Sequence, residues 1–148
     1  MCTAGTYASS AGSSQCTTCA PGTYSINGAT SCTPCILGYS MQSAGASACS
    51  PCSSGYYAPI NGATLCFACP DGSSSSIASS VCSSCLPGSS STYTGLCYIC
   101  SPGYFASGTA MSSCQQCQAG KFAVAGQTTC TSCPLGFYSG AASGGNLQ

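Results

Sequence analysis

The sequence contains almost no ionisable side chains. Of 148 residues, one is a lysine (Lys121) and one is an aspartate (Asp71), while histidine, arginine and tryptophan are absent. Without clustered basic residues, the chain lacks the positive surface that nucleic-acid-binding proteins use, so we expect no nucleic-acid partner. Acid–base catalysis and the activation of nucleophiles also depend on ionisable groups, and we therefore predict that the protein is not an enzyme.

Long apolar runs are also missing. No stretch approaches the roughly 20 apolar residues that span a bilayer, so direct membrane insertion is not expected. The first residues, Met1 to Gly5, lack the basic start and the apolar run of a signal peptide. We expect the chain to be part of a longer secreted protein.

Cysteine, in contrast, is abundant. Seventeen cysteines in 148 residues exceed the content of roughly 8–10% that marks a disulfide scaffold. Disulfides persist in oxidising surroundings, which predicts a secreted protein located outside the cell or on its surface.

The cysteines define an internal repeat. After Cys2 they form eight C-x-x-C pairs, and the second cysteine of each pair is followed three residues later by glycine. An aromatic residue usually stands two positions after that glycine, as in Cys19-Ala-Pro-Gly-Thr-Tyr24. We place nine repeats in a single array over 1–148, the last one incomplete, at approximately 2–18, 19–34, 35–51, 52–68, 69–84, 85–99, 100–116, 117–132 and 133–148.

Each spacing that recurs in the repeats has a physical interpretation. A glycine at a fixed distance from cysteine indicates a positive φ or a position too crowded for a Cβ atom. The aromatic residue is the only large apolar group of most repeats, so we expect it to pack over a disulfide or against the next repeat. No window has helical periodicity. The predicted fold is a small disulfide-rich one, an elongated tandem-repeat rod with short β-strands and turns and essentially no helix.

Two disulfide schemes fit the spacing. In the first, the second cysteine of one pair bonds the first of the next, which leaves Cys133 for a cysteine beyond the chain. In the second, pairs interlock, as in Cys16–Cys32 with Cys19–Cys35, and Cys2 pairs upstream. We favour the first because it makes successive repeats equivalent. Its bonds are Cys2–Cys16, Cys19–Cys32, Cys35–Cys49, Cys52–Cys66, Cys69–Cys82, Cys85–Cys97, Cys100–Cys114 and Cys117–Cys130.

C-x-x-C pairs also occur in zinc sites and in thioredoxin-like redox proteins. Each four-cysteine zinc centre carries a net charge of −2, which neighbouring cations usually offset, and the single lysine cannot do so for several centres. A redox C-x-x-C motif belongs at a helix start within a βαβ unit, which this sequence does not contain. We therefore expect no metal and no cofactor.

Two loops, 69–82 and 85–97, carry serine runs and lack the aromatic residue at its usual offset. Uncharged secreted chains that are rich in serine and threonine commonly bear O-linked glycans. We expect covalent O-glycosylation here, with the candidates Ser73, Ser74, Ser75, Ser76, Ser89, Ser90, Ser91 and Thr92.

The unit seen in Cys19-Ala-Pro-Gly-Thr-Tyr24 and in Cys100-Ser-Pro-Gly-Tyr-Phe105 resembles the ephrin-receptor-like cysteine-rich repeat, of the growth-factor-receptor and TNF-receptor class. The resemblance covers the whole chain and implies an elongated extracellular rod laddered by disulfides. The charge-poor composition is similar to long runs of this repeat in protist and algal surface proteins, including the mastigonemes of flagella.

These observations favour a structural component of an extracellular filament or surface coat. Its expected partners are copies of itself or other filament subunits. The alternative is the stalk of a cell-surface receptor, adhesin or variable surface antigen.

Overall fold

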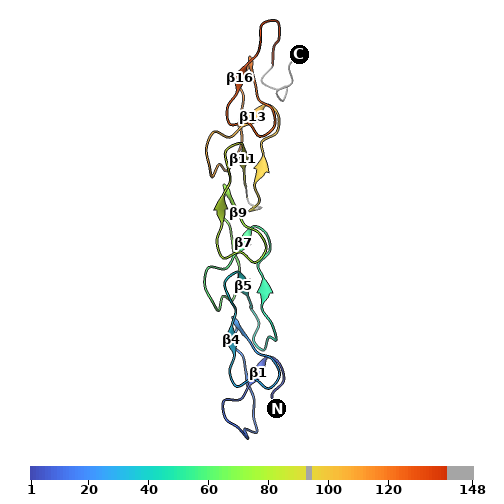
Figure 1. Ribbon diagram of the computed structural model, residues 1–148, viewed down its shortest axis with the longest axis vertical. Coiled ribbons are helices and arrows are strands. Elements are labelled where there is room, and N and C mark those ends of the chain that lie inside the picture. Colours follow the sequence, from blue (N-terminus) through green and yellow to red (C-terminus); the bar gives the residue numbers. More distant parts are fainter. Residues whose placement is uncertain (93–94, 140–148) are drawn as a thin grey trace. The chain divides into compact units, whose positions relative to one another are not determined.

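The computed structural model describes residues 1–92 and 95–139, so the end of the ninth predicted repeat (133–148) lies outside the described residues. Strands of two residues, paired into antiparallel hairpins, are the regular structure of the described part, which contains no helix. Figure 1 shows them as short arrows joined by irregular loops. The hairpins are β1 (Thr6–Tyr7) with β2 (Thr17–Thr18), β3 (Thr23–Tyr24) with β4 (Thr33–Pro34), β5 (Tyr39–Ser40) with β6 (Ser50–Pro51), β7 (Tyr56–Tyr57) with β8 (Phe67–Ala68), β9 (Ser73–Ser74) with β10 (Ser83–Ser84), β11 (Ser89–Ser90) with β12 (Tyr98–Ile99), β13 (Tyr104–Phe105) with β14 (Gln115–Gln116), and β15 (Lys121–Phe122) with β16 (Thr131–Ser132).

The repeat motif explains where these strands lie. The first strand of each hairpin directly follows the repeat glycine, by which we mean the glycine three residues after the second cysteine of a pair. The second strand consists of the two residues between the cysteines of the next pair. A β-turn precedes the first strand, as at Ala20-Pro21-Gly22-Thr23, where the Thr23 amide donates to the Ala20 carbonyl at 3.1 Å. Pro21 suits the second position of that turn and Gly22, with φ +80°, the third. The predicted small disulfide-rich fold, with short strands and turns and no helix, is confirmed for the described residues.

Disulfides close the loops between consecutive cysteine pairs. Across seven of these bonds the Cα–Cα distances are 5.5 to 5.8 Å, and each bond joins the second cysteine of one pair to the first of the next. Cys69 and Cys82 are disulfide-bonded as well, and Cys133 is a free thiol. The seven bonds with these distances are Cys2–Cys16, Cys19–Cys32, Cys35–Cys49, Cys52–Cys66, Cys85–Cys97, Cys100–Cys114 and Cys117–Cys130.

The chain divides into two compact units. The first comprises Met1–Ala68 and Ser75–Cys82, and the second comprises Cys69–Ser74 and Ser83–Gln148. The same repeat builds both units, so each is described by itself below.

The core of each repeat consists of sulfur and small side chains. In every disulfide loop the cysteine at the start of the loop is buried, whereas its partner at the end of the loop is half-buried or exposed. The residue three positions after the repeat glycine is the second buried position, and it is alanine or serine in most repeats. The buried members of that position are Ser25, Ala58, Ser75, Ser91, Ala106, Ala123 and Ser139.

Candidate functional site

Backbone hydrogen bonds join each repeat to the next one. In the first unit, the Gly22 amide of repeat 2 donates to the Met41 carbonyl of repeat 3 at 2.7 Å, and the Gly45 amide of repeat 3 donates back to the Cys19 carbonyl at 2.9 Å. The second unit repeats this pattern, with the Ala110 amide donating to the Cys85 carbonyl at 2.9 Å. Since a two-stranded hairpin is at best marginally stable alone, these bonds make each repeat depend on its neighbours.

The small buried position takes part in the same junction. The Ser25 amide donates to the Ala46 carbonyl of the next repeat at 3.2 Å, and its hydroxyl donates to the Thr6 carbonyl of the preceding repeat at 2.9 Å. Met41 occupies the same position in repeat 3 and keeps the equivalent bond, its amide donating to the Ala63 carbonyl at 3.1 Å. This position was not among the predicted ones, although its constant offset from the repeat glycine is visible when the repeats are aligned.

The repeat glycine is required for two reasons at once. Gly38 has φ +80°, and a Cβ atom built on it would lie 2.0 Å from the carbonyl oxygen of Ala78. Gly72 and Ala110 stand in the same relation in the second unit, also at 2.0 Å. Ala78 lies two repeats after Gly38, so repeats that are not consecutive in the sequence are in backbone contact. Positive φ and crowding, the two alternatives predicted for this glycine, are both present.

Repeats that contact each other in this way carry similar turns in the middle of their loops. The residue with positive φ in this mid-loop turn is Gly12, Gly28, Gly45, Gly62, Ala78, Gly95, Ala110 or Gly126. The position two residues before this positive-φ residue carries an exposed apolar side chain in even-numbered repeats and a small residue in odd-numbered repeats. In repeat 6 this position is Tyr93, which lies outside the described residues. The described positions are Ile26, Ile60 and Val124 in even repeats, and Ser10, Ser43, Ser76 and Gly108 in odd repeats. Successive repeats, which have the same disulfide pattern, therefore differ at this position of the turn.

A groove recurs between consecutive repeats. Between repeats 7 and 8 it has a volume of about 440 Å³ and is lined by Phe105, Gln115, Gln116, Gln118, Lys121, Thr129 and Cys130. Between repeats 2 and 3 the corresponding groove has a volume of about 260 Å³ and is lined by Tyr24, Ile36, Tyr39, Ala48 and Cys49. The aromatic residue two positions after the repeat glycine thus lies at the junction with the next repeat.

Serine replaces this aromatic residue in several repeats, and there its hydroxyl lies beside a sulfur atom of the next repeat. The Oγ to Sγ distances are 3.2 Å for Ser40 with Cys66 and 3.2 Å for Ser90 with Cys114. The aromatic or serine side chain of one repeat is accordingly adjacent to the end of the following disulfide loop.

The burial of the serine runs corrects part of the predicted glycosylation set. Ser73, Ser75 and Ser91 are 7%, 8% and 1% exposed, and a sugar on a buried hydroxyl has no space in the folded chain. The Ser73 hydroxyl donates to the Pro70 carbonyl at 2.6 Å, and that of Ser75 donates to the Tyr56 carbonyl at 2.9 Å. Ser74, Ser89 and Ser90 are half-buried, so the exposed candidates are Ser76 and Thr92.

The described residues contain no group of three or more His, Cys, Asp or Glu side chains arranged to hold a metal ion. Within the same part of the chain, no helix has the length and apolar character needed to cross a membrane. Lys121 lines the groove between repeats 7 and 8, whereas Asp71 lies in the loop of repeat 5.

The fold and its junctions define a small disulfide-rich tandem repeat of extracellular type. Residues 22–64 match the family described as tyrosine-protein kinase ephrin type A/B receptor-like. The matched stretch is less than one third of the chain and runs from repeat 2 into repeat 4. It confirms the resemblance to ephrin-receptor-like cysteine-rich repeats, a type that is not usually enzymatic. No curated protein matches the chain.

Proposed function

We propose that the chain is a structural array of an extracellular filament or surface coat, in which exposed apolar side chains pack against copies of the chain or other subunits. The observation that carries this proposal is the surface. Ile26, Ile60 and Ile99 are 68%, 60% and 71% exposed, and only one lysine and one aspartate are present in the whole chain.

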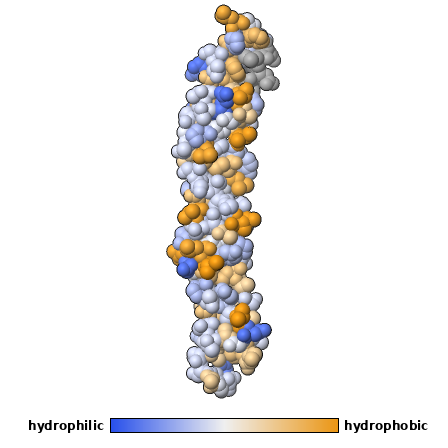
Figure 2. Space-filling model, viewed as in Figure 1, coloured by the Kyte–Doolittle hydropathy of each residue, from blue (hydrophilic) through white to orange (hydrophobic). Residues whose placement is uncertain are grey.

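Such a surface is costly for an isolated soluble domain. Mixed charges keep soluble proteins apart, and large exposed apolar patches usually mark interaction sites. Figure 2 shows strongly apolar side chains at intervals on the visible face, among residues of weak polarity and few strongly hydrophilic ones. O-linked glycans on the exposed Ser76 and Thr92 would cover part of the remainder.

The apolar mid-loop turns of the even repeats are the contact points that we assign to this assembly. Ile26 and Ile60 belong to repeats 2 and 4, whose backbones are in contact: a Cβ atom on Gly22 would lie 2.2 Å from the Gly62 carbonyl oxygen. The odd repeats of this unit carry Ser10, Ser43 and Ser76 at the same position, and repeat 5 carries the exposed Ile77 at the next one.

Sedimentation velocity of the oxidised chain over a range of concentrations tests this assignment. The double variant Ile26→Ser/Ile60→Ser copies the odd repeats and should weaken self-association by about tenfold or more, since a buried isoleucine contributes roughly 1.5–3 kcal/mol. Thr30→Ser/Thr64→Ser, exposed and equivalent in the same two repeats, is the matched control and should leave association unchanged. A wild-type chain that stays monomeric, together with native material that lacks fibres in electron micrographs, would contradict the proposal.

The second candidate is the stalk of a receptor, adhesin or variable surface antigen. The match of residues 22–64 to a receptor-like family favours it. Electron microscopy of native material distinguishes the two: fibres with a regular axial repeat support the filament, whereas dispersed or membrane-tethered stalks support the second candidate.

A further inference from the structure

The groove between repeats 7 and 8 differs from the groove between repeats 2 and 3 by its polar lining. Phe105 and Gln115 are directly opposite each other across β13 and β14, so their side chains emerge on the same side of the hairpin. Gln118 and Lys121 are the first and last residues of the next β-turn, in which the Lys121 amide donates to the Gln118 carbonyl at 3.1 Å. The hairpin and the turn thus form two walls of one groove.

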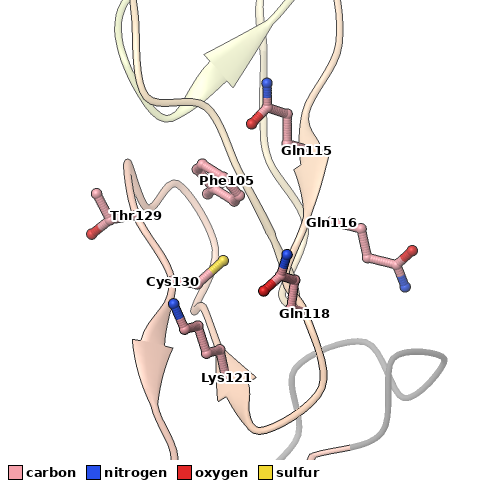
Figure 3. A pocket seen from close by; sticks show the side chains of 7 residues that line it. All are labelled: Phe105, Gln115, Gln116, Gln118, Lys121, Thr129 and Cys130. Carbon is pink, nitrogen blue, oxygen red and sulfur yellow. The ribbon is translucent and has the colours of Figure 1, made fainter.

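Figure 3 shows how the side chains lie in this groove. Phe105, Gln118 and Lys121 surround the same space, with Cys130 beside the lysine, whereas Gln116 points away from it. None of the lining residues is acidic, and the only carboxylate side chain of the sequence is Asp71. The only cationic side chain of the chain therefore lies in a groove that offers it neutral neighbours.

The groove between repeats 2 and 3 has the same backbone frame with different chemistry. Ile36 and Tyr39 occupy the positions of Gln118 and Lys121, and the Tyr39 amide donates to the Ile36 carbonyl at 3.0 Å in the equivalent turn. Tyr24 occupies the position of Phe105. The fold therefore tolerates either set of side chains, and the polar set at repeats 7 and 8 is not needed to form the junction.

We propose that the groove between repeats 7 and 8 binds an acidic sugar unit of a polysaccharide, such as a uronic acid residue. The ring of Phe105 presents an apolar face to the C–H groups of a pyranose. The side-chain amides of Gln115 and Gln118 both donate and accept hydrogen bonds, as sugar hydroxyls do. Lys121 forms a charge-assisted hydrogen bond with the sugar carboxylate. The volume of about 440 Å³ lies within the range of roughly 300–1,000 Å³ that small-ligand sites have.

This site is independent of the assembly proposed above, because it uses different residues and requires no second copy of the chain. Its openness to solvent and the few polar contacts predict weak binding by one sugar unit, with Kd on the order of 1–10 mM. Several units of one polysaccharide would bind more firmly only through further grooves or copies.

Titration of the oxidised, ¹⁵N-labelled chain with methyl β-D-glucuronide, followed by NMR, tests the proposal. We expect shift changes at the backbone and side-chain amides of Gln115, Gln118 and Lys121, and binding of methyl β-D-glucoside that is weaker by about tenfold, the effect of losing one hydrogen bond to a charged group. Lys121→Gln should remove this preference for the acidic sugar and retain the weak binding of the neutral one.

The matched variant is Gln118→Ile/Lys121→Tyr, which copies the groove between repeats 2 and 3 and so keeps a junction that this fold already forms. It should abolish glucuronide binding with the rest of the spectrum unchanged. The proposal fails if glucuronide shifts no signals in the wild type, or if this variant binds it equally well. It also fails if acetate or a blocked aspartate amide shifts the same signals as strongly, because the groove would then recognise a carboxylate and not a sugar.

Discussion

The replacement Gly38→Ala should disrupt the contact between repeats 3 and 5. Alanine at a positive φ costs roughly 1–2 kcal/mol by itself. The added Cβ atom would lie 2.0 Å from the Ala78 carbonyl oxygen, which is backbone and cannot rotate away. The junction must therefore open, and the hydrogen bonds from Gly38 to Ala58 at 3.0 Å and from Ala78 to Cys52 at 2.8 Å are at risk.

We estimate the total loss for Gly38→Ala at about 3–4 kcal/mol, counting roughly 1 kcal/mol for each hydrogen bond lost. Gly62→Ala is the matched control in the same unit. Gly62 has φ +75°, but a Cβ atom there would meet its nearest neighbours at 3.8 and 3.9 Å. Ala78 occupies the equivalent turn position with φ 59°. This control should lose only about 1–2 kcal/mol, the strain of the backbone conformation.

Urea unfolding with the disulfides intact, monitored by near-ultraviolet circular dichroism, measures both free energies. Amide hydrogen exchange at Gly38, Ala58 and Ala78 locates the damage, and protection should fall at these sites in Gly38→Ala alone. Equal losses of stability in the two variants would refute the reasoning, because the close approach between repeats 3 and 5 would then contribute nothing.

Two further predictions concern the core. Ser25→Ala removes a hydroxyl that bonds the Thr6 carbonyl at 2.9 Å and should cost about 1 kcal/mol, whereas Ser91→Ala removes a buried hydroxyl with no hydrogen-bond partner among the described residues and should be neutral or stabilising by up to about 1 kcal/mol. Urea midpoints decide this, and equal losses would contradict it. Cys35→Ala/Cys49→Ala removes a bridge of sequence separation 14 and should cost about 3 kcal/mol, whereas Cys133→Ala, at a free thiol, should cost less than about 1 kcal/mol. Thermal unfolding of the pair measures the difference, and similar melting temperatures would argue against a stabilising bridge.

The sequence predicts the local part of the fold because its causes lie within one repeat. The offset from cysteine to glycine encodes a turn, and the turn determines where the first strand of each hairpin begins, as at Gly22 and Thr23. The short strands and the lack of helix follow from composition and from the absence of helical periodicity. These features require no knowledge of how the repeats contact one another.

The groove and the buried serines could not be predicted in this way, because they depend on contacts between repeats. A run of serines is polar in the sequence, and it suggested exposed glycosylation sites. In the fold, Ser75 occupies the same buried position as Ala58 and bonds the Tyr56 carbonyl. In the sequence, Gln118 and Lys121 belong to no recognisable binding motif. Only the β-turn that begins at Gln118 and ends at Lys121 places both side chains in one groove.

The contact between alternate repeats gives the parity of a repeat a physical meaning. Gly5 of repeat 1 approaches Gly45 of repeat 3, and Gly22 of repeat 2 approaches Gly62 of repeat 4. In the first unit these glycine contacts therefore join repeats of the same parity, in addition to the hydrogen bonds between consecutive repeats. Because Ile26 and Ile60 stand where the odd repeats of this unit carry serine, loss or gain of a single repeat would place isoleucine and serine at this position in repeats that contact each other. Insertion or deletion of two repeats would preserve the alternation at this position, so the pair of repeats is the unit of length that keeps it.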